Sequence, residues 1–113
     1  MKKNAIAALD QKYLWHPFTQ QSEWEKGDPL VVRSAKGAIL TDTEGRRYVD
    51  GVSSLWVTAH GHRHPALDRA VRRQLGKMAH TTFLGLTHEP AARLGQALVE
   101  IAPRGLRRVF YSD

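Results

Sequence analysis

The five prolines of this 113-residue sequence constrain its fold most, because a proline begins or ends a regular element and is rarely found inside one. They stand at Pro17, Pro29, Pro65, Pro90 and Pro103. Before the first of them, residues 5–14 have apolar side chains at helical spacing, with Asn4 as the predicted N-cap. Pro17 ends that helix, and residues 15–19, Trp-His-Pro-Phe-Thr, are predicted to be extended.

A run of short strands follows Pro29. Residues 30–34 and 38–41 are apolar segments separated by Lys36-Gly37. Residues 42–45, Asp-Thr-Glu-Gly, are predicted to form a hairpin turn into a third strand over residues 47–50. The pattern indicates a small antiparallel meander.

Two amphipathic helices are predicted next, one from Pro65 and one from Pro90. The stripe of the first contains Leu67, Ala70, Val71, Leu75 and Met78, and the stripe of the second contains Ala91, Leu94, Leu98 and Ile101. The loop between them, residues 81–87, is neither periodic nor very polar, and such loops often line a pocket or an interface. Residues 108–111 are predicted to be a final strand, which completes an α+β order.

That last strand runs into Ser112-Asp113. In α/β enzymes a buried strand usually leads into a loop and a helix N-terminus that binds an anion. We therefore expect this chain to be the front piece of a larger enzyme.

Composition excludes several classes of protein. The net charge of +6 suggests a nucleic-acid partner, but the arginines are scattered as pairs without interleaved aromatic residues or a nucleic-acid-binding motif, so solvated faces are the favoured interpretation. The absence of cysteine excludes disulfides, thiolate metal sites and a cysteine nucleophile. No apolar run has the length of a membrane span, and Asp10 interrupts the apolar N-terminal stretch, so we expect no membrane partner, no export and a cytoplasmic location.

Three histidines in five residues, His60, His62 and His64, suggest metal ligation. Arg63 would repel a cation, however, and Gly61 with Pro65 makes the segment a turn into a helix. Local hydrogen bonding is therefore the favoured role, and no metal site is expected. The lysines all lie in polar surroundings, so none is predicted to be an amine nucleophile.

The aromatic residues leave two interpretations open. Five aromatic residues have the size and polarity of core residues or of residues at the edge of a cavity: Tyr13, Trp15, Phe18, Trp24 and Trp56. Periodicity alone favours the core. The irregular, turn-rich surroundings of Trp15 and Trp56 favour the edge of a ligand pocket.

Four segments carry a family resemblance: WHPFTQ (residues 15–20), DGVSSLW (50–56), HGHRHP (60–65) and VFYSD (109–113). Together they resemble the N-terminal part of class III aminotransferases over roughly residues 9–113. The first two segments resemble most the branch that acts in biotin biosynthesis. The resemblance implies a fold-type I α/β homodimer with active sites at the subunit interface. Residues 1–58 would form the N-terminal helix and small-domain meander, and residues 59–113 the helices and first strand of a large pyridoxal-phosphate-binding domain.

The reaction that the resemblance implies is transfer of an amino group to the ketone of 8-amino-7-oxononanoate, giving 7,8-diaminononanoate. Pyridoxal 5′-phosphate would be the cofactor, and S-adenosylmethionine or lysine the amino donor. In the family, a Ser-Gly-Ser-like phosphate-binding turn follows the position of Asp113, and the lysine that carries the cofactor comes far later. These 113 residues are therefore expected to contain no catalytic and no cofactor-binding residue, and to be inactive alone. The alternatives are another class III ω-aminotransferase, acting on a diamine or ω-amino acid, and a basic module that binds nucleic acid or protein.

Three substrate-binding residues follow from the resemblance: Phe18, Leu55 and Trp56. Phe18 stands where better-known members carry a tyrosine, and Leu55 where they carry a tryptophan, while Trp56 matches the next tryptophan. Both differences remove hydrogen-bond donors from the expected pocket, which should change how it selects substrates. They resemble the branch that uses lysine as the amino donor. Residues 84–87 are the segment expected to cross the dimer interface.

Overall fold

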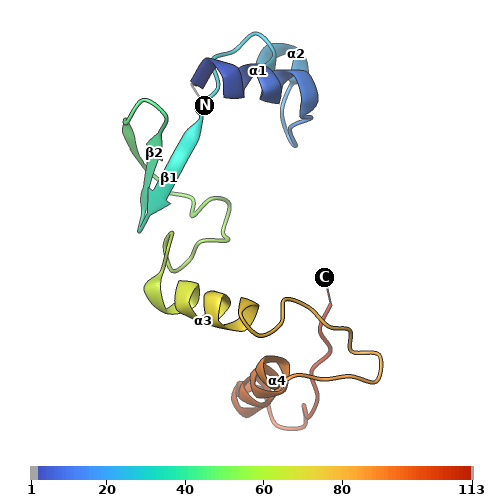
Figure 1. Cartoon of the computed structure of the whole chain (residues 1–113). Coiled ribbons are helices and arrows are strands. Elements are labelled where there is room, and N and C mark those ends of the chain that lie inside the picture. The colour runs from blue at the N-terminus through green and yellow to red at the C-terminus, as the bar shows by residue number, and fades with distance from the viewer. Residues whose placement is uncertain (1–2, 113) are drawn as a thin grey trace. The chain divides into compact units, whose positions relative to one another are not determined.

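The structure is a computed structural model, and it describes residues 3–112. Its elements follow one another along the chain as α1 (Lys3–Tyr13), α2 (Gln21–Trp24), β1 (Val32–Lys36), β2 (Ile39–Asp42), β3 (Arg47–Val49), α3 (Pro65–Leu75) and α4 (Glu89–Ile101). All of them except β3 are labelled in Figure 1. The chain divides into two compact units, Met1–Val71 and Arg72–Asp113, and each unit is described by itself.

The sheet of the first unit is an antiparallel meander in the order β1-β2-β3, as the sequence predicts. Lys36 pairs with Ile39 across the first turn, and Ile39 pairs with Val49 across to β3. Between Val32 and Ser34 the register of β1 shifts, which marks a bulge. The predicted boundaries of the three strands are right to within about two residues, which is the usual uncertainty for element ends.

Asp42 organises the turn between β2 and β3. Its side chain is only 2% exposed. The carboxylate accepts hydrogen bonds from the backbone N–H groups of Glu44 and Arg46 (2.9 Å each), from Arg46 Nε (2.7 Å) and from the Tyr48 hydroxyl (3.0 Å). Burial by itself would raise the pKa of Asp42, but these hydrogen bonds outweigh it and lower the pKa to about 2. The turn is thus built around an ionised carboxylate.

The helices differ from prediction in three details. α1 begins at Lys3, so Asn4 lies inside the helix and the prediction that it is the N-cap is wrong. α2 was not predicted, because a single turn of four residues is too short to show a hydrophobic period. α3 ends at Leu75, so Met78 lies beyond the helix whose stripe it was expected to extend.

The predicted strand over residues 108–111 is not formed. A strand requires a partner to complete its ladder of hydrogen bonds, and no other part of residues 3–112 pairs with this segment. Its ordered contacts are instead made by one side chain. The Tyr111 hydroxyl donates to the Ala91 carbonyl in α4 at 2.7 Å, and the Tyr111 ring stacks on Phe83 with centroids 5.9 Å apart.

Very little of the chain is buried. Within residues 5–112 only Ala7, Pro29 and Asp42 are buried, and the apolar stripes of α3 and α4 contain no buried residue. The accessible area is 10119 Å². Two separate compact units of these lengths would expose about 7,500 Å² in total. Each unit therefore exposes apolar faces that it does not cover itself.

Candidate functional site

The three predicted substrate-binding residues lie on two separate irregular segments of the first unit. Phe18 lies in the turn between α1 and α2, and Leu55 and Trp56 lie between β3 and α3. All three side chains are exposed: 106% for Phe18, 59% for Leu55 and 81% for Trp56. None of them belongs to a hydrophobic core, so the core interpretation of these aromatic residues is wrong for Phe18 and Trp56.

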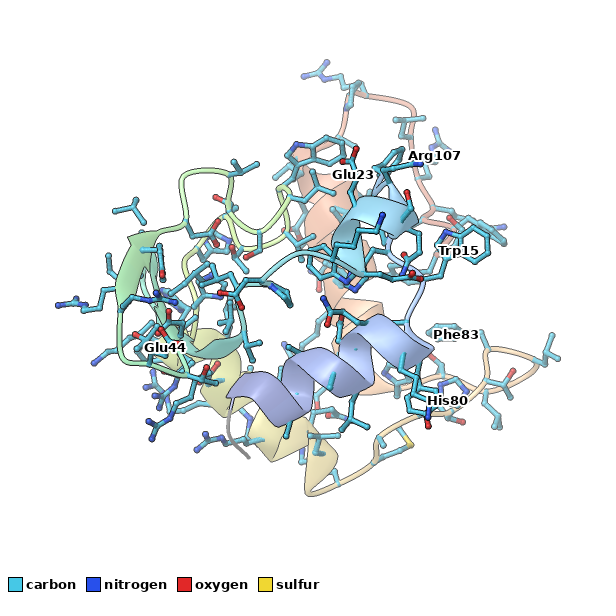
Figure 2. All side chains as sticks on the ribbon, turned by 90° about the horizontal axis from the view of Figure 1, so that it is seen from above. Trp15, Glu23, Glu44, His80, Phe83 and Arg107 are labelled. Atoms are coloured by element: carbon cyan, nitrogen blue, oxygen red, sulfur yellow. The ribbon has the colours of Figure 1, made fainter. Side chains whose placement is uncertain are left out.

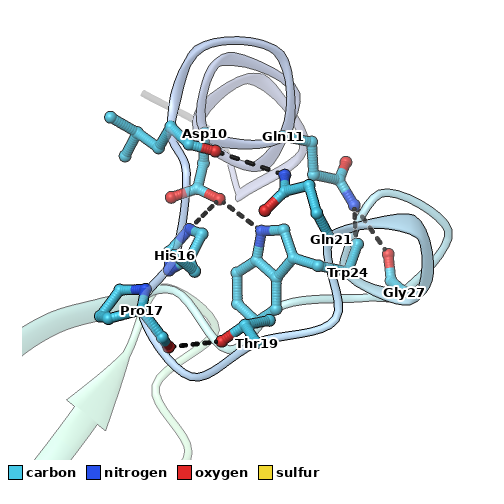
Figure 3. Close-up of polar contacts among 9 residues, drawn as sticks. Asp10, Gln11, His16, Pro17, Thr19, Gln21, Trp24 and Gly27 are labelled. Atoms are coloured by element: carbon cyan, nitrogen blue, oxygen red, sulfur yellow. Dashed lines mark hydrogen bonds and ion pairs between the residues drawn. The ribbon is translucent and has the colours of Figure 1, made fainter.

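The Phe18 turn is held by Asp10 of α1, as Figure 3 shows. One carboxylate oxygen, Oδ2, accepts hydrogen bonds from His16 Nε2 at 2.9 Å and from Trp24 Nε1 at 2.8 Å. The His16 and Trp24 rings also contact each other, with centroids 4.2 Å apart. The Trp24 hydrogen bond, followed by that of His16, lowers the pKa of Asp10. Trp24, half-buried, is thus part of the support of the turn.

Two glutamine side chains fix the remainder of this segment to α1 (Figure 3). Gln11 Nε2 donates to the carbonyl oxygens of Trp24 and Gly27, at 3.0 Å each, and Gln21 Nε2 donates to the Leu14 carbonyl at 3.3 Å. At the tip, Phe18 has a φ of 52°. A positive φ is uncommon for a bulky residue and is maintained by its surroundings. Neighbouring Trp15, labelled in Figure 2, is 88% exposed.

The second segment, between β3 and α3, includes residues 53–56, which we call the left-handed turn. Ser53, Ser54, Leu55 and Trp56 have φ values of 52°, 47°, 61° and 70°. Left-handed backbone costs about 1–2 kcal/mol for each residue other than glycine, so four in a row cost about 4–8 kcal/mol. Such strain persists only where other contacts impose the conformation, and it often marks a functional site.

Asp50 supplies the contacts that impose this turn. Its Oδ1 accepts the backbone N–H of Ser54 at 2.8 Å, and its Oδ2 accepts the Ser54 hydroxyl at 2.7 Å and His62 Nε2 at 2.7 Å. The hydrogen bonds from Ser54, followed by that from His62, lower the pKa of Asp50 to about 2. The carboxylate is therefore ionised, and His62 carries its proton on Nε2.

Both ends of the same segment are attached to the β1–β2 hairpin. Gly37 and His62 exchange two backbone hydrogen bonds, at 2.9 and 2.8 Å, and the Asp50 N–H donates to the Ala38 carbonyl at 2.9 Å. Gly61 lies so close to Gly37 that a Cβ on Gly61 would be 3.2 Å from three Gly37 backbone atoms. A cavity of about 120 Å³ beside the turn is lined by Gly37, Ala38, Asp50, Ser53, Thr58, Ala59 and Gly61.

The structure does not bring Phe18 to Leu55 and Trp56. The cavity near the Phe18 turn, of about 320 Å³, is lined by Thr19, Gln20, Glu23, Trp24, Gly27, Asp28 and Pro29. Neither this cavity nor the one beside residues 53–56 is lined by any of the three predicted residues. They lie instead on exposed surfaces that the first unit holds in place.

The loop between α3 and α4 lines a cavity of about 400 Å³ in the second unit, as expected for residues 81–87. Its walls are Ala79, His80, Thr81, Thr82, Phe83, His88, Tyr111 and Ser112. Figure 2 labels His80 and Phe83 on this loop. His88 caps α4 by accepting the Ala91 N–H at 3.4 Å, and its ring stacks on Phe83 at 5.3 Å. Sequence reasoning missed His88 and Tyr111, because only the folded loop brings them to Phe83.

Of the three histidines predicted to form local hydrogen bonds, His62 forms one with its side chain, to Asp50. The His60 and His64 rings are 5.9 Å apart. Within residues 3–112, no group of three or more His, Cys, Asp or Glu residues is arranged to hold a metal ion. Over the same range, no helix combines the length and apolarity needed to cross a bilayer.

Among the lysines whose side chains the structure describes, none has the surroundings that would attach an aldehyde cofactor. Such a site needs an amine kept away from water. Lys12, Lys26, Lys36 and Lys77 are all exposed.

Comparison with known proteins identifies the family. The model of the family described as aminotransferase class-III matches residues 21–113. An adenosylmethionine-8-amino-7-oxononanoate aminotransferase from Nitratidesulfovibrio vulgaris is 53% identical over 108 residues, covering 96% of this chain and 20% of that protein. The protein of that name from Anoxybacillus flavithermus is 50% identical over 118 residues, covering 100% of this chain and 26% of its own length.

Solved structures of transaminases also resemble this chain. The crystal structure of adenosylmethionine-8-amino-7-oxononanoate aminotransferase from Methanocaldococcus jannaschii matches 98% of this chain and 25% of its own chain, with a TM-score of 0.93 and 37% identity. An (S)-enantioselective omega-transaminase from Thermomicrobium roseum matches 96% of this chain and 24% of its own, with a TM-score of 0.88 and 32% identity. The chain spans about a quarter of the length of these relatives. It belongs to the class-III aminotransferase family.

Proposed function

We propose that this chain is the substrate-recognising N-terminal quarter of an aminotransferase of biotin biosynthesis, which transfers an amino group to 8-amino-7-oxononanoate. The observation that carries the proposal is the 42–53% identity to relatives that bear the name of that activity. Among the solved structures the omega-transaminase is 32% identical, which is lower than these values. Family membership also favours an enzyme over the alternative of a basic binding module.

In this proposal, Phe18, Leu55 and Trp56 form apolar walls against the substrate. Their support comes from the structure of the two segments: each is exposed, and each segment is tied down by a carboxylate that accepts hydrogen bonds from a histidine and one other side chain. Rigid support of this kind is what a binding site requires, because it reduces the ordering cost of binding. The chain orients substrate and excludes water at these positions.

Pyridoxal 5′-phosphate supplies the electron sink for amino transfer when it is bound. We propose that residues outside the present chain hold it, in a fold-type I homodimer. Residues 1–58 belong to the small domain in this proposal, and residues 59–113 lead into the large one. Residues 84–87 contact the partner subunit.

We further propose lysine as the amino donor. Tyrosine and tryptophan side chains each carry a donor group, and the Phe18 and Leu55 side chains carry none. A pocket without these donors loses a means of holding the polar groups of S-adenosylmethionine, whereas an aliphatic donor such as lysine suits apolar walls.

A complete enzyme is needed for the test, because the chain spans only a quarter of its relatives. In the chimeric enzyme, this chain replaces the matching 26% of the Anoxybacillus flavithermus relative. Turnover of 8-amino-7-oxononanoate is measured with lysine, with S-adenosylmethionine and with a diamine, and the parent relative is the control. Turnover of the diamine with other ketones, but not with 8-amino-7-oxononanoate, would favour the ω-aminotransferase alternative.

The double variant Phe18→Tyr, Leu55→Trp tests the donor directly. It restores the two lost donor groups, so we expect the ratio of kcat/KM for S-adenosylmethionine to that for lysine to rise at least tenfold. An unchanged ratio would show that these two positions do not select the donor.

A further inference from the structure

The left-handed turn of residues 53–56 carries two of the proposed substrate-binding residues, and its conformation is one that its own sequence does not favour. None of the four residues is glycine, yet each has a φ between 47° and 70°. Two backbone hydrogen bonds tie residues of the turn back to the segment before it, from the Trp56 N–H to the Val52 carbonyl at 3.0 Å and from the Ser53 N–H to the Asp50 carbonyl at 3.4 Å. Something outside the turn must therefore hold it.

Asp50 is the group that reaches the turn from outside. It contacts Ser54 twice, at the backbone N–H (2.8 Å) and at the hydroxyl (2.7 Å). The same carboxylate accepts His62 Nε2 at 2.7 Å, and His62 is bound through its backbone to Gly37 of the hairpin. The Asp50 side chain is 8% exposed and the His62 side chain 17%, so both are largely shielded from competing water.

We propose that Asp50, Ser54 and His62 are positioning residues that lock residues 53–56 in the left-handed conformation and so set the directions of Leu55 and Trp56 toward the substrate. None of the three touches the substrate in this scheme. They act through the backbone, because the orientation of a side chain follows from the φ and ψ of its own residue. The inference deepens, and rests on, the proposed function.

The chain offers a matched control for the hydroxyl of Ser54. Ser53 lies in the same turn with a φ of 52°, against 47° for Ser54, and its hydroxyl has no hydrogen-bond partner in the described part of the chain. Ser54→Ala and Ser53→Ala thus remove the same atom from neighbouring residues of similar conformation. Only Ser54→Ala removes a hydrogen bond to the Asp50 carboxylate.

The experiment follows Trp56 directly in the chimeric enzyme labelled with 5-fluorotryptophan. The ¹⁹F resonance of Trp56 is assigned as the one lost in Trp56→Phe, and that of Trp24 is the reference for intact folding. We expect Ser54→Ala and Asp50→Ala to move or broaden the Trp56 resonance and to leave Trp24 unchanged. Ser53→Ala should move neither. If the Trp56 resonance is the same in Ser54→Ala as in the unsubstituted enzyme, the proposal is overturned.

Kinetics provide the second measurement. Loss of one hydrogen bond to a charged group corresponds to about a tenfold change in an equilibrium constant. We expect Ser54→Ala to raise KM for 8-amino-7-oxononanoate by about that factor while kcat changes less than twofold, and Ser53→Ala to leave both unchanged. A fall in kcat alone, with KM and the Trp56 resonance unchanged, would contradict a positioning role.

The two proposals fail in different ways. If the unsubstituted chimeric enzyme does not turn over 8-amino-7-oxononanoate, the proposed function is wrong. The ¹⁹F comparison of Ser54→Ala with Ser53→Ala still decides in that case whether Asp50 and Ser54 hold the turn. If Asp50→Ala fails to fold, as the Trp24 resonance would show, the single-hydroxyl variant Ser54→Ala decides alone.

Discussion

Replacing Gly61 by alanine should weaken the bridge that ties the segment after β3 to the β1–β2 hairpin. Gly61 has a φ of 76°, and an added Cβ would be 3.2 Å from the Cα, C and O atoms of Gly37. All three contacts are with backbone, so no flexible side chain can move aside. The two backbones must move apart by a few tenths of an ångström for the methyl group to fit.

The loss of stability in Gly61→Ala can be worked out from its contacts. A left-handed alanine costs about 1–2 kcal/mol relative to glycine. The shift also lengthens and weakens the two hydrogen bonds between Gly37 and His62, each of which contributes about 0.5–1.5 kcal/mol. The amides of Gly37 and His62 should therefore lose up to about 1–3 kcal/mol of protection, which corresponds to as much as about 5- to 150-fold faster hydrogen exchange.

Hydrogen exchange of the chimeric enzyme, read by mass spectrometry at these two amides, measures this effect. Gly45→Ala is the control, because Gly45 also has a positive φ, 84°, but nothing lies within 4 Å of its added Cβ. The Gly45→Ala variant should lose stability only through the strain of its left-handed backbone, and hydrogen exchange at Gly37 and His62 should be unchanged. Equal exchange at the two amides in Gly61→Ala and the unsubstituted enzyme would refute the argument that close approach of the two glycines holds the bridge.

Three other outcomes are expected. Tyr111→Phe removes the hydrogen bond to the Ala91 carbonyl and should lower the free energy of unfolding, measured by urea titration, by about 1 kcal/mol. Tyr13→Phe is the control, because the Tyr13 hydroxyl has no partner among the described residues, and it should leave the free energy of unfolding unchanged. The carboxyls of Asp42 and Asp50 should titrate near pH 2 in ¹³C NMR spectra, against an ordinary value of 3.8. Since the pKa of both carboxyls is lowered in the folded state, the stability that they contribute is complete above about pH 4 and is lost as the pH falls toward 2. Titration of these carboxyls at pH 3.8 would show that the hydrogen bonds are absent. Finally, the exposed apolar faces predict that the 113-residue chain alone self-associates in sedimentation experiments as its concentration rises, and a well-folded monomer at all concentrations would contradict this.

The elements that the sequence predicts correctly are those with a local signal. The three strands are marked by turn residues, and α3 and α4 by a proline at the start and an apolar stripe. The strand predicted at residues 108–111 is the instructive error. Its apolar composition is that of a buried strand, but strand formation depends on a partner that composition does not reveal.

The candidate site was less predictable, since its geometry depends on contacts between residues that are distant in sequence. Local hydrogen bonding is the role predicted for all three histidines of residues 60–64, whereas the side-chain partner of His62, Asp50, lies 12 residues earlier. The supporting role of Trp24 depends on Asp10, 14 residues away. The left-handed backbone of residues 53–56 has no sequence signal, because such backbone is normally predicted from glycine or asparagine, and Val-Ser-Ser-Leu-Trp contains neither.

The hydrogen bonds to Asp42 also have a consequence for the order in which the chain folds. All of their donors lie two to six residues further along the chain. Contacts this local form quickly, since a hairpin closes in about 1–10 μs. A ribosome adds only about 5–20 residues each second. Once β3 has emerged from the ribosome, the sheet can form before His62 emerges, and the Gly37 edge is then a preformed template on which residues 50–62 fold.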